Sequence, residues 1–119
     1  MNNEVYDAFI EQRKDKEIKS LYHLTQISFA YHSNKIEGSC LNEKQTELIY
    51  DAGCVNFNEN KDPVRIDDVI EMRNHFYLFD YMLDTYDEPL NEQLILKYHS
   101  ILKAGTSQSF DPEYNLSVM

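Results

Sequence analysis

The chain has 119 residues, enough for one small domain with one modest hydrophobic core. Its formal net charge of −10 disfavours nucleic acid as a partner, because an acidic surface repels phosphate backbones. With only three glycines and three prolines, the chain lacks the regular turns of a β-sandwich, and this composition favours long helices.

The first predicted element is a helix from about Glu4 to His32. Its second half carries two apolar stripes at helical spacing, so we expect it to be covered on more than one side. Its first half is charged, and basic residues alternate there with acidic ones, which is typical of a solvated face. After His32 the sequence predicts a break or a very short helix that ends at Gly38, with Ser33 as a cap and Ile36 in the core.

The second predicted helix begins at an Asn42 cap, where Gln45 occupies the capping-box position. It ends at Gly53, and a loop to residue 63 follows. The clearest helix in the sequence covers residues 64–84, because its apolar residues recur at intervals of three and four.

The last predicted helix begins at an Asn91 cap and ends before Gly105. The tail, residues 106–119, shows no periodicity. The sequence therefore predicts an all-α fold with about four main helices.

Targeting signals are missing from the sequence. The start, Met1–Asp7, is polar and acidic, unlike a signal peptide. The richest apolar stretch, Phe76–Leu83, contains Asp80 and is far shorter than the roughly 20 residues of a membrane span. The spacing of Cys40 and Cys54 matches no zinc or redox pattern, so we expect two buried or idle thiols. These features predict a cytoplasmic protein that has no membrane partner.

Residues with catalytic chemistry are sparse. The four histidines do not show the spacing of a zinc helix, and three glycines do not build a phosphate loop. Glu71 and His75 lie one helical turn apart and could share a metal, but a hydrogen-bonded pair is the commoner result of that spacing. We interpret Glu71, Asn74 and His75 as a structural polar cluster, and we expect neither catalytic nor metal-ligating residues.

The segment Ser33-Asn34-Lys35-Ile36-Glu37-Gly38 resembles the inhibitory motif of Fic proteins, in which Ser or Thr and three further residues precede Glu and then Gly or Asn. The longer run FAYHSNKIEGSCLNEKQTELIY is similar to the N-terminal region of that family. The runs DDVIEMRNHFYLFDYML and LNEQLILKYHSILKAGT resemble, in the family's order, the next helix and the first helix of the Fic core. The resemblance to a Fic (Fido) protein covers about residues 18–107.

Fic proteins transfer AMP from ATP to a hydroxyl group of a target protein, so the resemblance implies the regulatory part of such an AMP transferase. Residues 1–63 resemble its N-terminal region, and residues 64–119 resemble the first helices of its core. The family's His-Pro-Phe…Gly-Asn-Gly-Arg motif does not occur in the sequence. We therefore expect a truncated chain that is inactive alone and binds neither the ATP nor the divalent metal of the complete enzyme.

The resemblance also implies a role for Glu37 within the inhibitory motif of Ser33, Glu37 and Gly38. In the family, the corresponding Glu pairs with the final Arg of the catalytic motif, which otherwise holds the γ-phosphate of ATP. The resemblance does not indicate the target protein.

Two alternatives to this interpretation remain open at this point. The chain could be a separate binding module that inhibits another Fic enzyme in trans, as antitoxins of the family do. It could also be a plain helical interaction domain whose motif is a coincidence. Without the rest of a Fic core, the apolar stripes of the last two helices would be partly bare and would favour self-association. These stripes include Phe76, Phe79, Tyr98 and Leu102.

Overall fold

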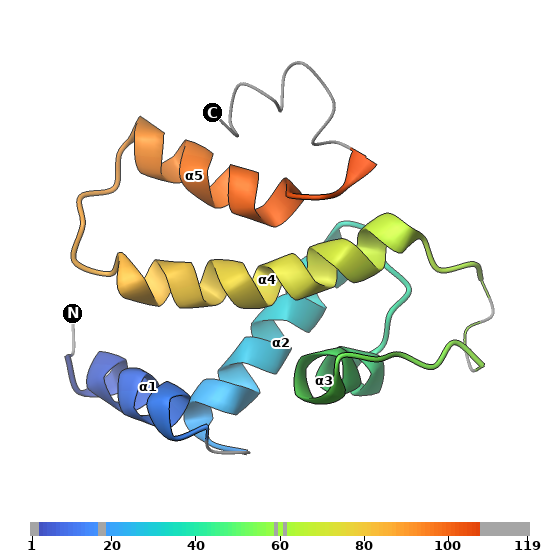
Figure 1. Ribbon diagram of the computed structural model, residues 1–119, viewed down its shortest axis with the longest axis horizontal. Coiled ribbons are helices and arrows are strands. Elements are labelled where there is room, and N and C mark those ends of the chain that lie inside the picture. Colours follow the sequence, from blue (N-terminus) through green and yellow to red (C-terminus); the bar gives the residue numbers. More distant parts are fainter. Residues whose placement is uncertain (1–2, 17–18, 59, 61, 108–119) are drawn as a thin grey trace.

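The fold is all-α, as the sequence predicts. A computed structural model describes residues 3–16, 19–58, 60 and 62–107, and this part of the chain contains five helices and no strand (Figure 1). The helices are α1 (Asn3–Asp15), α2 (Leu21–Ile36), α3 (Glu43–Ala52), α4 (Ile66–Asp84) and α5 (Glu92–Lys103). The longest, α4, is central: α5 runs antiparallel along one side of it, and α2 crosses its other side (Figure 1).

The prediction of one long helix from Glu4 to His32 is wrong, because the chain forms two helices, α1 and α2, in this region. Lys16 and Lys19 adopt φ angles of 54° and 62°, in the left-handed region that an α-helix of L-residues avoids. Ser20 then begins α2 as its N-cap, and its side chain accepts a hydrogen bond from the backbone N–H of His23. The break gives five helices where about four were expected.

The predicted break at His32 is also wrong. Helix α2 continues to Ile36, so Ser33 lies inside the helix and does not cap it. Gly38 follows the end of the helix with a φ of 96°, the left-handed conformation that glycine adopts without strain. Ile36 was expected in the core, but it is 87% exposed because it lies on the outer face of the last turn.

The predicted boundaries of the later helices are confirmed. Asn42 and Gln45 form both hydrogen bonds of a capping box at the start of α3, and Gly53 ends that helix in the left-handed conformation. Asn91 caps α5 by accepting a hydrogen bond from the backbone N–H of Leu94. The predicted tail falls almost entirely outside the described residues.

The hydrophobic core lies where α2, α3 and α4 meet. Its buried residues are Ile27, Ala30, Leu41, Ile49, Met72 and Phe76. Phe76 was expected to be partly bare, but it is only 6% exposed because α2 and α3 cover it. The other three residues of that expectation, Phe79, Tyr98 and Leu102, are half-buried.

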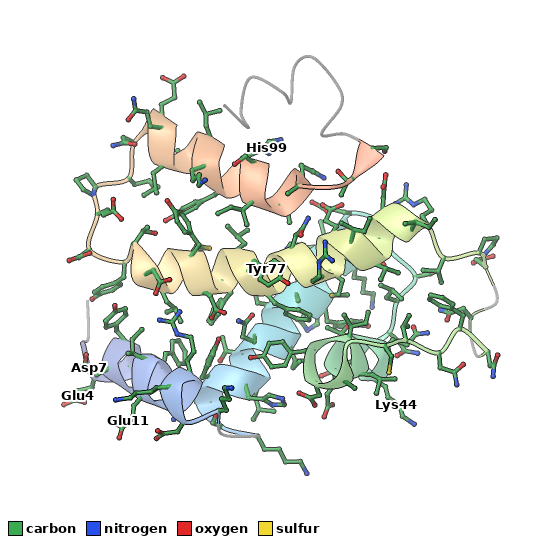
Figure 2. All side chains as sticks on the ribbon, in the orientation of Figure 1. Glu4, Asp7, Glu11, Lys44, Tyr77 and His99 are labelled. Carbon is green, nitrogen blue, oxygen red and sulfur yellow. The ribbon has the colours of Figure 1, made fainter. Side chains whose placement is uncertain are left out.

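Helix α1 packs on α2 and on the end of α4. Arg13 donates a hydrogen bond from Nη2 to Oδ1 of Asp84 at 2.8 Å. The acidic residues Glu4, Asp7 and Glu11 are exposed and lie on the side of α1 that faces away from the other helices (Figure 2). The negative charge of this segment therefore faces solvent.

None of the helices in the described part of the chain combines the length and the apolar character needed to cross a membrane. Cys40 and Cys54 are free thiols, and both are exposed.

Candidate functional site

A polar pocket of about 370 Å³ lies where the end of α2, the start of α4 and the end of α5 meet. Charged side chains dominate its lining, which consists of Glu37, Arg65, Asp67, Asp68, Glu71, Lys103, Thr106 and Ser107. Four of these residues carry carboxylates and two carry basic groups. Such a lining suits a cation or a basic side chain better than an apolar ligand.

Asn34 fixes the end of α2 against α4. Its side chain is 1% exposed, and its Nδ2 donates a hydrogen bond to the backbone oxygen of Asp68 at 3.2 Å. The backbone oxygen of Asn34 also accepts a hydrogen bond from the N–H of Ser39 at 3.1 Å, across the turn that contains Gly38. These contacts hold Glu37, the C-cap residue of α2, at the rim of the pocket.

A buried ion pair joins α4 to α5 on the wall of the pocket. Lys103 donates from Nζ to Oε1 of Glu71 at 2.8 Å, and their side chains are only 12% and 9% exposed. Near the first turn of α4, Arg65 pairs with Asp68 at 2.8 Å. The two basic residues of the pocket are therefore each matched to a carboxylate.

The carboxyl groups of Glu37 and Glu71 interact directly. Partial burial and the adjacent Glu71 carboxylate raise the pKa of Glu37 to about 7. Burial acts to raise the pKa of Glu71 as well, but hydrogen bonds from Glu37 and Lys103 outweigh it and lower that pKa. Because Lys103 stabilises the ionised form of Glu71, Glu37 is the member of the pair that takes up a proton more readily.

His75 lies behind Glu71, one turn further along α4. It is 3% exposed, and burial lowers its pKa to about 4, so the ring is neutral at physiological pH. Neither ring nitrogen has a hydrogen-bond partner among the described residues. The ring packs edge-on against Phe29 of α2, with centroids 5.7 Å apart.

Asn74 connects α4 to the end of α5. It is 2% exposed, and its Nδ2 donates to the backbone oxygens of Leu102 and Ala104, each at 2.8 Å. Because the last carbonyls of a helix lack partners within the helix, Asn74 acts as a cap supplied from another helix. It thereby helps to position Lys103 over Glu71.

The fold brings one residue of the predicted inhibitory motif next to two residues of the predicted polar cluster, although the two groups are distant in sequence. Glu37 of the motif lies beside Glu71 and His75 of the polar cluster, with one ligand atom of each within 4.8 Å of the others. Asn74 of the cluster faces α5 instead. From the motif itself, Ser33 is half-buried inside α2 and does not line the pocket, and Gly38 provides the turn.

Sequence reasoning missed Lys103, Arg65 and Asp68. For Arg65 and Asp68 a signal was present, because oppositely charged residues three positions apart at a helix start commonly pair. For Lys103 there was none, because its partner Glu71 lies 32 residues away and the contact depends on how α5 aligns with α4.

A second buried polar network lies outside the pocket, between α2 and α4. Gln26 is completely buried, and its Nε2 donates to the backbone oxygen of Phe76 at 3.2 Å and to Oδ1 of Asp80 at 3.2 Å. The hydroxyl of Tyr22 also donates to Asp80. Burial, followed by the hydrogen bond to Asp80, raises the pKa of Tyr22 far above its usual value.

A comparison with models of known protein families finds no match for the chain. A comparison with curated protein sequences finds none at a significant level either. The resemblance to Fic proteins thus rests on the motif and on the order of the three sequence blocks.

Proposed function

We propose that this chain is the regulatory N-terminal part of a Fic-type protein AMP transferase that works in the cytoplasm. In this proposal Glu37 is the inhibitory residue, and Ser33 and Gly38 complete its motif. The complete enzyme would use ATP and a divalent metal to transfer AMP to a protein hydroxyl. The observation that carries the proposal is the position of Glu37, an exposed residue that is anchored at the end of α2 and lines a charged pocket.

The proposed inhibition depends on a carboxylate that can accept a guanidinium. Lys103 pairs with Glu71, and no described residue forms an ion pair with Glu37. An arginine brought by the catalytic motif would supply that positive partner, and Arg–carboxylate pairs are bidentate and specific. An arginine held by Glu37 no longer binds the γ-phosphate of ATP, so the α-phosphate is not placed for attack.

The second candidate function is a binding module that inhibits a separate Fic enzyme in trans. The observation that favours it is the exposure of Glu37 at the end of a helix, where a second chain can reach it. Both functions use the same residue and the same arginine. They differ only in whether the arginine is covalently joined to this chain.

Labelling with radioactive ATP tests the trans function. The assay contains a complete Fic enzyme whose own inhibitory Glu is replaced by Gly, together with the wild-type chain, Glu37→Gln or Glu47→Gln. Glu47 is an exposed residue of α3 outside the motif, so it controls for the loss of one negative charge. The trans function predicts less labelling with the wild type and Glu47→Gln, and full labelling with Glu37→Gln. Equal inhibition by all three chains would contradict any role for Glu37.

If none of the chains inhibits in trans, the same variants are compared after fusion to a Fic catalytic core. There the regulatory proposal predicts that only Glu37→Gln releases AMP transfer. Size-exclusion chromatography of the free chain separately tests self-association, which the exposed apolar residues Ile66 and Leu90, 77% and 72% exposed, would favour.

A further inference from the structure

His75 is unusual among the polar groups of this protein. Its ring is 3% exposed, and neither nitrogen finds a hydrogen-bond partner among the described residues. Buried polar atoms are almost always paired, so an unpaired imidazole calls for an explanation such as an ion that it binds. A neutral imidazole has a lone pair to offer, and burial keeps this ring neutral.

The surroundings of His75 contain the other ligands that a metal ion needs. Glu71 precedes it by four residues on α4, so the two side chains leave the helix on the same face. Glu37 approaches from the end of α2. One ligand atom of each of the three residues lies within 4.8 Å of the others.

Binding requires the three ligand atoms to move closer together. Ligands that each lie about 2.1 Å from a tetrahedral zinc ion are about 3.4 Å apart, roughly 1.4 Å less than the largest separation here. Glu71 and His75 are buried and held by the helix, whereas Glu37 is exposed and its side chain is the one that can move inward.

We propose that Glu37, Glu71 and His75 bind a divalent transition-metal ion, with Zn²⁺ as the best fit. Two carboxylates balance the charge of such an ion, and an imidazole favours zinc over magnesium or calcium. The ion would tie the end of α2 to the middle of α4. This inference does not depend on the proposed function.

Lys103 is the competing cation in the same place. Its ammonium contacts Oε1 of Glu71 at 2.8 Å, and the carboxyl group of Glu37 hydrogen-bonds to Glu71 as well, so a bound metal ion takes the place of the proton that those two carboxyl groups share. The remaining charged groups of the pocket are Asp67, Asp68 and Arg65, of which Arg65 already neutralises Asp68. Removing the ammonium should therefore strengthen metal binding, which separates a metal site from a merely structural polar cluster.

Isothermal titration calorimetry with Zn²⁺ tests the proposal on the full chain. Cys40 and Cys54 are exposed thiols that bind zinc themselves, so every protein carries Cys40→Ser and Cys54→Ser. We expect one equivalent to bind, with affinity reduced at least about tenfold by Glu37→Gln or His75→Gln. His32→Gln is the matched control, because His32 is an exposed histidine of α2. It should leave the affinity unchanged.

Two further measurements keep the test decisive if a variant folds poorly. Lys103→Met should bind Zn²⁺ more tightly than the parent, and Co²⁺ bound to the parent should show the absorption of nitrogen and oxygen ligands without sulfur. The absence of saturable binding by the parent would overturn the proposal. It would equally be overturned if Glu37→Gln and His75→Gln both kept the parent's affinity, or if Lys103→Met bound more weakly.

Discussion

The cap that Asn74 provides to α5 leads to a quantitative prediction. Asn74 is 2% exposed, and its Nδ2 donates to the backbone oxygens of Leu102 and Ala104, each at 2.8 Å. Replacement by Ala leaves two carbonyls without this donor at a partly buried place. An unsatisfied buried group costs about 1–3 kcal/mol, and since the two carbonyls are only partly buried and share one nitrogen, we expect a total loss of about 1–3 kcal/mol. That is a large part of the roughly 5–15 kcal/mol that stabilises a typical domain.

Urea unfolding followed by far-UV circular dichroism measures this loss. Asn58→Ala is the matched control because Asn58 is exposed in the loop between α3 and α4, and it should change the free energy of unfolding by less than about 0.5 kcal/mol. Asn74→Asp should cost more than Asn74→Ala, because it places a carboxylate against the two carbonyl oxygens. If Asn74→Ala were as stable as the control, the interhelical cap would contribute nothing to stability, contrary to this prediction.

Three further predictions concern pH, exposure and backbone conformation. The fold keeps Tyr22 protonated, whereas the Tyr22 hydroxyl of the unfolded chain ionises near pH 10, so the free energy of unfolding should fall by up to about 1.4 kcal/mol per pH unit above 10. In unfolding curves measured at alkaline pH, Tyr22→Phe should flatten this slope, whereas the control Tyr77→Phe, at an exposed residue, should not. Ile36→Ser should change the free energy of unfolding in urea by less than about 0.5 kcal/mol, because Ile36 is 87% exposed. A larger loss would mean that the Ile36 side chain packs against another part of the protein. Gly53→Ala should lower the free energy of unfolding in urea by about 1–2 kcal/mol, because Gly53 has a φ of 68°. An added Cβ meets no atom within 4 Å, so backbone strain is the only expected cause, and an unchanged unfolding midpoint would contradict the prediction.

Local signals in the sequence predicted most helix boundaries. The capping box of Asn42 and Gln45 and the left-handed Gly53 depend on neighbouring residues alone, so their pattern is sufficient. The break before α2 was missed because Lys16 and Lys19 take the left-handed conformation there, and lysine is not a residue that marks a turn. Ser20, which caps α2, was the available signal.

The pocket could not be predicted in the same way. Glu37 reaches Glu71 because Asn34 anchors the end of α2 to α4, and Lys103 reaches Glu71 because α5 runs antiparallel to α4. Both contacts depend on how helices distant in sequence align. The periodicity of each helix identifies its apolar face but does not give the alignment between helices.

The most direct test of the proposed inhibitory role is the rate of AMP transfer by a fusion of this chain to a Fic catalytic core. We expect slow labelling with the wild-type chain and with Glu47→Gln, and labelling at least about tenfold faster with Glu37→Gln, because that variant loses a charge-assisted pair worth roughly 1.5–3 kcal/mol. Equal rates for Glu37→Gln and the wild-type chain, with both proteins folded, would contradict it.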